Sequence, residues 1–327
     1  GGDGGGSIRI PASTTGLFGL KPTRGRVTMA PFMGDAWGGY VQEHVLTRSV
    51  RDSALLLDIV AGGAPGDPYG APPPERPFLD EVGRDPGRLR VAFTRDALYG
   101  TEQHADCKTA VDDAVVLLES LGHEVVEGRP PFDREALIQA YFLQVAAGVA
   151  YYCEEAARHA GRGPRAGDFE PATWLLALIG WKSSAADLER ARQVVQKAAR
   201  GVAHWFEDVD VFVTSTLARP PARIGELLPT AGERNQMRAL RTVPIKPLLD
   251  VALGKMGSGK MAATPNTQLF NQTGQPGVSV PLHWNDDGLP IGVQLVGRFG
   301  DEATLLRLGA QLEQVRPWAA RKPELAG

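Results

Sequence analysis

The stretch GDGGGSIRIPASTTGLFGLKPTRGRV, residues 2–27, is the part of the sequence that decides the fold. Residues 1–28, which contain it, are rich in glycine, serine and threonine, with short apolar pieces at Leu17-Phe18 and Leu20, which predicts a loop rather than a helix. The three consecutive glycines Gly4–Gly6 allow positive φ angles and a close approach of the backbone to a ligand. Successive N–H groups in such a loop can point the same way and bind an anion.

Ser7 directly follows these glycines. Its hydroxyl is therefore placed to attack a carbonyl group while neighbouring amides hold the oxyanion that forms. On composition alone, a glycine-rich linker or a phosphate-binding loop explains Gly4-Gly5-Gly6-Ser7 equally well, so these alternatives stay open at this point.

The longer string resembles the second half of the signature of the amidase signature family. The match runs without a gap from Gly2 to Val27, and further pieces follow in the family's order at Glu43–Asp52, Asp210–Thr214, Phe270–Pro276 and Gly288–Gly297. The resemblance therefore covers nearly the whole chain. Within the family, the spelling Asp3-Gly4-Gly5-Gly6-Ser7 and the segment Trp37-Gly38-Gly39 most resemble 6-aminohexanoate-cyclic-dimer hydrolases.

This resemblance implies both a fold and a mechanism. The implied fold is α/β, an α/β/α sandwich around a mixed β-sheet whose N-terminal part is missing from this chain. Ser7 would form the acyl-enzyme, and the backbone amides of Gly4, Gly5 and Gly6, with that of Ser7, would line the oxyanion hole. A second serine, preceded by a cis peptide bond, would relay the proton to a lysine, because a hydroxyl is a poor nucleophile until a base takes its proton. In the family both residues precede the position of Gly1, so we expect this chain alone to be inactive.

Several side chains near these motifs are further candidates. Asp3 and Arg9 flank Ser7, and we expect a buried ion pair or loop-anchoring hydrogen bonds rather than substrate contact. Lys21 matches the structural lysine of the family's Gly-Leu-Lys-Pro-Thr segment, not the catalytic one, and we expect His44 to be structural too. Thr214–Thr216 and Asn271–Gln275 could border a pocket, although turns explain them as well. The chain has no Gly-x-Ser-x-Gly motif, which argues against a Ser-His-Asp hydrolase of the α/β type.

Hydrophobic periodicity predicts the remaining elements. A helix is expected from Thr47, where Ser49 followed by Asp52 forms an acidic capping box, and it ends at Gly62-Gly63. Strand 89–93, helix 109–121 and strand 123–126 form a unit typical of α/β layers. Further strands are expected at 209–214, 278–281 and 291–296, with a turn at 285–288, then a helix over 301–315 and a frayed tail.

Residues 133–208 have an almost wholly helical pattern, rich in Ala, Leu and Arg and carrying many aromatic rings. Exposed rings in such number would be costly, so we expect a helical insert or cap beside the sheet that shapes the substrate side. We predict a single amidase-type domain over residues 1–327 that contains this insert.

Composition narrows the classes of function. The net charge of −3 over 327 residues indicates no nucleic acid or anionic membrane as a partner. We expect no segment that spans a bilayer, no secretion signal and, with two cysteines, no disulfide framework. The expected location is cytoplasmic and the expected partner a small-molecule amide substrate; a homodimer is compatible with the sequence.

Neither a cofactor nor a metal is expected, since Cys107 and Cys153 lack partners at metal-ligand spacing. Gly254–Met261 has the spacing of a Walker A loop, yet Met261 stands where a Ser or Thr must bind Mg²⁺. No βαβ unit frames it either, so we interpret this segment as a flexible loop near the substrate entrance.

The sequence therefore leads to one hypothesis and two alternatives. The hypothesis is a cofactor-free amidase that hydrolyses a carboxamide bond through an acyl-serine intermediate on Ser7. The first alternative is a glutamyl-tRNA amidotransferase subunit, which shares the signature. The second is a catalytically inactive remnant or scaffold, because the base lysine and relay serine are absent from this chain.

Overall fold

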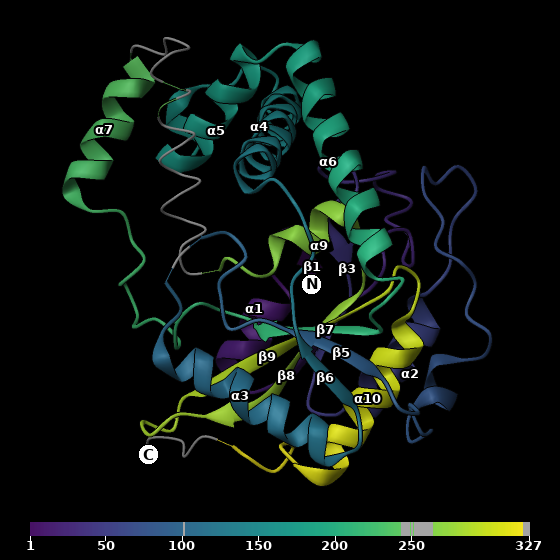
Figure 1. Cartoon of the computed structure of the whole chain (residues 1–327). Coiled ribbons are helices and arrows are strands. Elements are labelled where there is room, and N and C mark those ends of the chain that lie inside the picture. Colours follow the sequence, from purple (N-terminus) through teal and green to yellow (C-terminus); the bar gives the residue numbers. More distant parts are fainter. Residues whose placement is uncertain (101, 243–248, 250, 252–263, 323–327) are drawn as a thin grey trace. The chain divides into compact units, whose positions relative to one another are not determined.

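The computed structural model describes residues 1–100, 102–242, 249, 251 and 264–322. The chain divides into two compact units (Figure 1). The first, here called the sheet unit, comprises Gly1–Phe132, Ala199–Pro221 and Ala262–Gly327, and the second, the helical unit, comprises Asp133–Ala198 and Ala222–Met261.

A seven-stranded mixed sheet in the order β4-β2-β8-β9-β7-β5-β6 organises the sheet unit. β5 is parallel to β6 and β7, while the other neighbours are antiparallel. The α/β fold with a mixed sheet is thus confirmed. The strands are β2 (Phe18–Lys21), β4 (Leu46–Thr47), β5 (Arg90–Phe93), β6 (Glu124–Glu127), β7 (Val211–Ser215), β8 (Gly277–Trp284) and β9 (Pro290–Gly297). Two short strands, β1 (Gly2–Asp3) and β3 (Gln42–Glu43), pair antiparallel beside this sheet.

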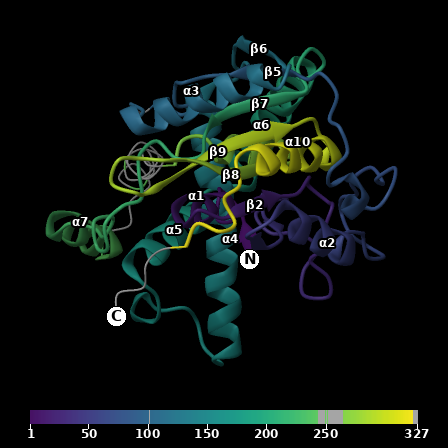
Figure 2. The same cartoon turned by 90° about the horizontal axis from the view of Figure 1, so that it is seen from below.

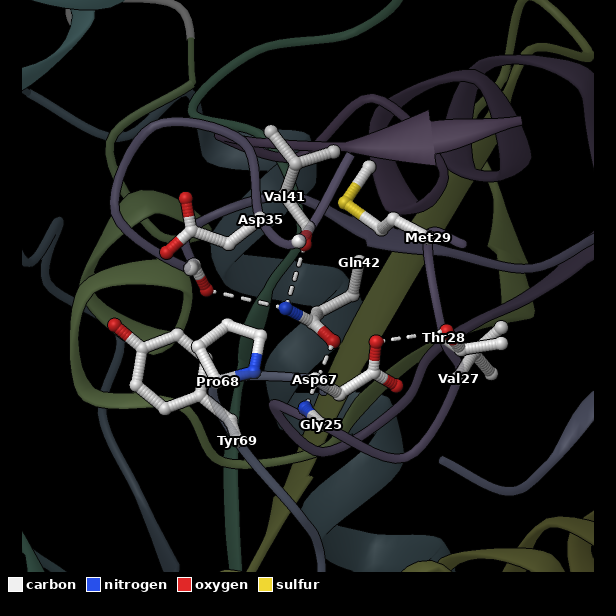
Figure 3. A pocket seen from close by; sticks show the side chains of 12 residues that line it. Gly25, Val27, Thr28, Met29, Asp35, Val41, Gln42, Asp67, Pro68 and Tyr69 are labelled. Atoms are coloured by element: carbon white, nitrogen blue, oxygen red, sulfur yellow. Dashed lines mark hydrogen bonds between the residues drawn. The ribbon is translucent and has the colours of Figure 1, made fainter. Parts of the chain in front are cut away.

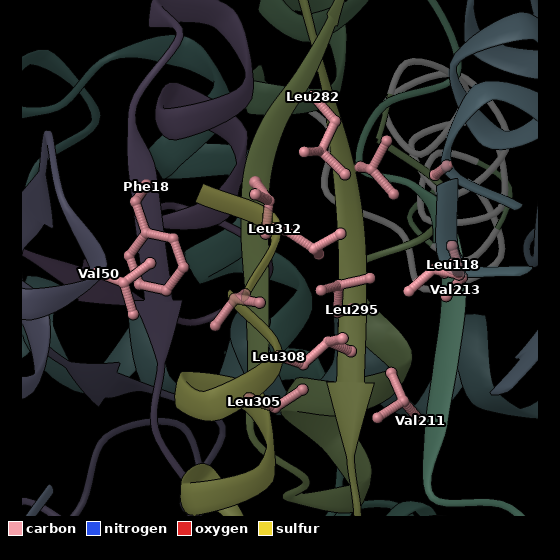
Figure 4. Close-up of a cluster of buried hydrophobic side chains, with 14 of the residues drawn as sticks. Phe18, Val50, Leu118, Val211, Val213, Leu282, Leu295, Leu305, Leu308 and Leu312 are labelled. Atoms are coloured by element: carbon pink, nitrogen blue, oxygen red, sulfur yellow. The ribbon is translucent and has the colours of Figure 1, made fainter. Parts of the chain in front are cut away.

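One face of the sheet carries the main hydrophobic core. Successive side chains of a strand alternate between faces, so that Ile291, Val293 and Leu295 of β9 all point to the same side. There they pack with three helices, α2 (Val50–Val60), α3 (Ala105–Ser120) and α10 (Glu302–Val315). Figure 4 shows Leu305, Leu308 and Leu312 of α10 gathered around Leu295, with Phe18 and Val50 alongside.

The opposite face is where polar residues are buried. The alternate positions of the same strands hold Lys21, Thr214, Ser279 and Gln294, none more than 1% exposed. Two short helices, α1 (Arg9–Thr15) and α9 (Gln268–Thr273), belong to this side. A Cβ added to Gly292 would lie 2.6 Å from the Oγ of Ser13 in α1, so a glycine is required for this close packing. Figure 2 shows the chain from a second side.

α1 corrects the expectation that the segment from Gly1 to Thr28 is a loop without a helix. A seven-residue helix is not stable by itself, and its stability here comes from contacts made elsewhere. The Asp3 carboxylate accepts hydrogen bonds from the N–H groups of Ile8 and Arg9 at its start, and Gly16 ends it in a left-handed conformation.

Three further boundaries differ from the predictions. α2 begins at Val50 rather than at Thr47, because Thr47 belongs to β4. α3 begins four residues before the expected position because His104 accepts a hydrogen bond from the N–H of Asp106 and so caps it. The tail expected to fray after Val315 is instead packed at Trp318, which is 1% exposed and whose Nε1 donates to the carbonyl of Arg48. One large aromatic ring outweighs the polar, proline-containing composition around it. The remaining predicted elements of the sheet unit, including the Ser49 cap of α2, are confirmed.

The helical unit contains α4 (Arg134–His159), the 3₁₀ turn Ala166–Asp168, α5 (Pro171–Lys182) and α7 (Ala231–Thr242). α6 (Ala185–Trp205) begins in this unit and ends in the sheet unit. A Cβ on Gly180 would lie 2.3 Å from the carbonyl oxygen of Ala146, so α4 and α5 meet backbone against backbone there. The helices expected within 133–208 are present; their role as a cap over a substrate stays a prediction.

α4 departs from the expectation that no segment can span a bilayer. By length and composition alone, this 26-residue helix is long and apolar enough to cross a membrane, and 44% of the most apolar window is buried in the structure. The many alanines of this helix raise its mean hydropathy, although the helix contains no long run of large apolar residues. A core helix of a globular protein meets the same criterion, so the observation is weak evidence for a membrane span.

Candidate active site

Ser7 lies in the short loop between β1 and α1, and its side chain is exposed. The loop is organised around the buried carboxylate of Asp3, which accepts backbone hydrogen bonds from Gly6 at 2.6 Å, Ile8 at 3.2 Å and Arg9 at 3.4 Å. The Ser7 hydroxyl makes no hydrogen bond with any residue that the structure describes. Asp3 therefore shapes the loop while leaving the serine side chain available.

The peptide units of this loop are held in different ways. Thr267 donates from its Oγ1 to the carbonyl of Gly5 at 2.6 Å, and the N–H at the other end of that unit, of Gly6, donates to Asp3. The carbonyl of Gly6 accepts from the N–H of Ile10 at 2.6 Å. The N–H groups of Gly5 and Ser7 donate to no acceptor within the described parts of the chain. These two amides are the ones free to meet a substrate oxygen there.

The hydrogen bond from Gly6 does not fit one part of the expected oxyanion hole. The resemblance assigns donors to Gly4, Gly5 and Gly6, but the Gly6 N–H already donates to the Asp3 carboxylate. Its φ of +127° and the 2.5 Å that would separate a Cβ from the Thr267 Oγ1 explain why this position is a glycine.

Arg9 connects the loop to residues far away in the sequence. Its guanidinium donates twice to Asp3, at 3.0 Å from both Nε and Nη2, and also to Asn271, Gln294 and the Thr267 carbonyl. Both Asp3 and Arg9 are 0% exposed, which confirms the buried ion pair predicted from the sequence. Gln294 in turn donates to Thr214, so β7 and β9 are tied to the same network.

Three members of this network were not singled out in the sequence, namely Thr267, Gln294 and, as a partner of Asp3, Asn271. Asn271 donates from its Nδ2 to the backbone and side chain of Asp3, at 2.7 and 2.9 Å. Gln294 carries the one available signal, because it is a lone amide in the apolar strand Pro290–Gly297 and points to the face opposite Leu295.

Electrostatics keeps the Asp3 carboxylate ionised. Burial favours the neutral acid, but the charge and hydrogen bonds of Arg9 outweigh it and lower the pKa of Asp3 from 3.8 to about 2. The carboxylate is thus a fixed negative charge that is neutralised by Arg9 and is unsuited to take a proton from Ser7.

Lys21 and His44 do not reach Ser7 by any hydrogen bond in the described structure. Lys21 is buried and its Nζ donates to the carbonyl of Pro22 at 2.8 Å; burial, and then the charge of Arg9, lower its pKa well below 10.5. The Nε2 of His44 lies 3.1 Å from the hydroxyl of Ser53, and burial lowers the pKa of His44 to about 4. Both positions agree with the structural roles expected for them.

A strained turn packs against the glycine loop. Trp37 has a φ of 53°, and it is the one residue other than glycine with a positive φ in the part of the chain that the structure describes. For a bulky residue this conformation costs about 1–2 kcal/mol. The carbonyl of Ala36 accepts from the N–H groups of Gly39 and Val41 and closes the turn. The Trp37 ring lies against Gly4, where an added Cβ would come within 2.7 Å of its Cζ3.

Residues of this turn also line a small pocket (Figure 3). Val41 lines it, together with Gln42, whose amide bonds the carbonyls of Gly39 and Val41 and the N–H of Gly25. Asp67, which also lines it, accepts from Thr28 at 3.1 Å. The Gln42 bonds thus tie the turn to the backbone at Gly25.

Other candidates from the sequence have no described hydrogen bond with Ser7, or lie outside the described residues. Cys107 in α3 and Cys153 in α4 are buried free thiols. Among the described residues, no group of three or more His, Cys, Asp or Glu side chains is placed to hold a metal ion. The Walker-like segment Gly254–Met261 lies outside the described residues.

A serine beside two available amides on a glycine loop agrees with the family that the sequence resembles, and comparison with known proteins decides the matter. The family model described as Amidase matches residues 1–306. The chain belongs to the amidase family. Two relatives are 6-aminohexanoate-cyclic-dimer hydrolases, from Pseudomonas sp. strain NK87 and Paenarthrobacter ureafaciens, each 33% identical over 333 residues that cover 99% of this chain.

A solved structure of a 6-aminohexanoate cyclic dimer hydrolase in complex with its substrate has the same fold as this amidase family member. Its TM-score is 0.84 at 32% identity, over 99% of this chain and 65% of that one. The chain spans 64% of the length of the two hydrolases it matches in sequence. The amidase signature fold is therefore established for this chain, as the sequence predicted.

Proposed function

We propose that this chain carries the nucleophile of an amidase that hydrolyses a carboxamide bond through an acyl-serine intermediate on Ser7. Membership of the amidase family supports hydrolysis of a C–N bond. The observation that carries the assignment to Ser7 is its exposed hydroxyl on a loop whose Gly5 and Ser7 amides have no described acceptor, while Asp3 holds the neighbouring amides.

The reaction follows in two steps. The Oγ of Ser7 attacks the carbonyl carbon, and the negative charge that develops on the carbonyl oxygen is held by the N–H groups of Gly5 and Ser7. The C–N bond breaks, the amine leaves with a proton, and an ester remains on Ser7. Water then attacks this ester and releases the carboxylic acid, which regenerates the hydroxyl.

The proton of Ser7 must be taken by a base, and the described residues near the loop do not supply one. Asp3 is committed to Arg9, and Lys21 to Pro22. We propose, as the family resemblance implies, that a lysine acts through a relay serine, and that both precede the position of Gly1. Residues 1–327 alone should then turn over amides slowly or not at all.

The relatives' names indicate which substrate to assay first. We propose that the substrate is a small oligoamide, and the cyclic dimer of 6-aminohexanoate is the first compound to assay, beside simple linear amides.

The test compares the complete gene product with its Ser7→Ala variant. Without the hydroxyl no acyl-enzyme forms, so kcat should fall by about 10⁴-fold or more. The release of amine is measured, and quenched reactions are searched by mass spectrometry for an acyl group on the peptide that contains Ser7. Ser120→Ala, at an exposed serine of α3, is the control and should keep full activity. Activity of Ser7→Ala within tenfold of the parent would refute the assignment.

A further inference from the structure

We propose that Trp37 is a positioning residue, which sets the orientation of the Gly4–Gly5 peptide unit beside Ser7. The inference rests on the proposed function, because the Gly5 amide matters to catalysis only if it faces an oxyanion formed by attack of Ser7. It goes beyond the family signature, since Trp37 lies outside the glycine loop and neither attacks nor deprotonates anything.

The contact between Trp37 and Gly4 is close and specific. An ideal Cβ on Gly4 would lie 2.7 Å from Cζ3 and 2.8 Å from Cε3 of the indole, and 3.0 Å from a methyl carbon of Val41. The ring therefore lies directly against the Gly4 backbone. Because the carbonyl of Gly4 and the N–H of Gly5 share one rigid plane, a ring pressed against Gly4 limits how far that plane can rotate.

Hydrogen bonds hold the neighbouring peptide units. Thr267 and Asp3 hold the Gly5–Gly6 unit at its two ends, and Asp3 holds the N–H of Ile8. Packing by Trp37 thus acts on the unit that carries the Gly5 N–H, one of the two amides without a described acceptor. A shift of about 1 Å in such a donor is enough to lower a rate about 10²-fold.

Several side chains donate hydrogen bonds to the backbone of the turn that carries Trp37. The carbonyl of Gly39 accepts from Arg24 at 2.8 Å and from Gln42 at 3.1 Å. The carbonyl of Tyr40 accepts at 3.0 Å from the Nδ2 of Asn271, which also donates to Asp3. Strained conformations persist where their surroundings over-determine them, and they gather at functional sites. One asparagine amide thus ties the strained turn and the nucleophile loop together.

The test is a double-substitution cycle between Gly4 and Trp37 in the complete gene product, with the cyclic dimer or the best linear amide as substrate. Trp37→Leu should lower kcat about 10- to 100-fold and leave KM within about threefold, because a misplaced oxyanion donor acts on the transition state. Trp37→Phe, which keeps a ring against Gly4, should stay within about threefold of the parent. Gly4→Ala should be severe alone, and its effect on kcat should shrink at least about tenfold in the Trp37→Leu background.

Unfolding of the same four proteins in urea gives a readout that does not depend on catalysis. Because the added methyl group clashes with the indole, the midpoint shifts of Gly4→Ala and Trp37→Leu should fail to add. Gly128→Ala, at a glycine with ordinary φ and no atom within 4 Å of an added Cβ, is the matched control and should add.

Three outcomes would overturn the inference. A raised KM with unchanged kcat for Trp37→Leu would show that the ring contacts substrate instead. Additive effects both on kcat and on the urea midpoint would show that the contact between Trp37 and Gly4 affects neither catalysis nor stability. Normal kcat for Trp37→Leu, alongside an inactive Ser7→Ala, would refute this inference and leave the proposed function intact, whereas an active Ser7→Ala would refute the proposed function itself.

Discussion

The substitution Asp3→Asn removes the charge that organises the loop around Ser7 and keeps the shape of the side chain. The carboxylate accepts three backbone hydrogen bonds, two from the Arg9 guanidinium and one from Asn271. An amide has one oxygen fewer, and its NH₂ group would face a donor, either the Gly6 N–H or Arg9. The loop then loses acceptors, and Arg9 stays buried without its counter-charge.

Two figures bracket the expected loss of stability. The lowering of the Asp3 pKa from 3.8 to about 2 corresponds to about 2.5 kcal/mol of preference for the ionised form, at 1.36 kcal/mol per pKa unit. Removal of one partner from a buried ion pair costs about 3–5 kcal/mol, because the other charge is left unpaired. Arg9 keeps acceptors on Gln294, Asn271 and the Thr267 carbonyl, which softens that penalty. We therefore expect a loss of about 3 kcal/mol.

The assay is urea unfolding at pH 7 of the parent, Asp3→Asn and the control Asp287→Asn, which changes an exposed carboxylate and should shift stability by less than about 0.5 kcal/mol. The pH dependence supplies a second check. Since folding lowers this pKa, the stabilisation is complete above pH 3.8 and is lost as the pH falls toward 2, so the difference between parent and Asp3→Asn should narrow over that interval. A loss below about 1 kcal/mol at pH 7, or one equal to that of Asp287→Asn, would refute the role given to Asp3.

Two further predictions concern neighbouring residues. His44 is 4% exposed, and folding lowers its pKa from 6.5 to about 4, so the unfolded chain binds a proton at a higher pH than the folded chain. Neutral His44 therefore contributes fully to the free energy of unfolding above pH 6.5, and about 3 kcal/mol of that free energy should be lost as the pH falls to 4. Stability measured against pH should lose that slope in His44→Gln, and an unchanged slope would contradict the assignment. Gly6→Ala should destabilise by about 2–4 kcal/mol, because φ is +127° and the new Cβ would lie 2.5 Å from the Thr267 Oγ1. Thermal unfolding measures this loss, with Gly128→Ala as the control; a drop equal to that of the control would mean that the loop relaxes freely.

The elements that could be predicted from the sequence are those whose causes are local. Alternation of apolar residues marks β8 and β9. The start of α2 is marked by Ser49, whose hydroxyl accepts a hydrogen bond from Asp52, only three residues later in the sequence. α1 could not be predicted this way, because its seven residues depend on a carboxylate six residues before Arg9 and on packing against β8 and β9. Trp318 illustrates the same limit, since its partner is the carbonyl of Arg48, 270 residues away.

The candidate site divides along the same line. The pairing of Asp3 with Arg9 was predicted, because the two residues are close in sequence and flank the glycines. The partners of Arg9 on Thr267, Asn271 and Gln294 are at least 258 residues distant, and no periodicity in a single sequence connects them. The packing of Trp37 on Gly4 was equally out of reach, because a left-handed tryptophan contradicts the residue's own preference and is imposed by bonds to Gly39 and Tyr40.

The buried polar network explains how a glycine-rich sequence can form a well-defined loop around Ser7. Three glycines in a row would sample many conformations, and each hydrogen bond to Asp3 or Thr267 removes some of that freedom. A bare carboxylate beside Ser7 would oppose the negative charge of an oxyanion, but Arg9 neutralises it at 3.0 Å and is itself held by residues of two other segments, α9 with its cap Thr267 and β9. Folding and the proposed chemistry therefore use the same bonds. The network orients the Gly5 and Ser7 amides, but none of its described acceptors bonds their N–H groups.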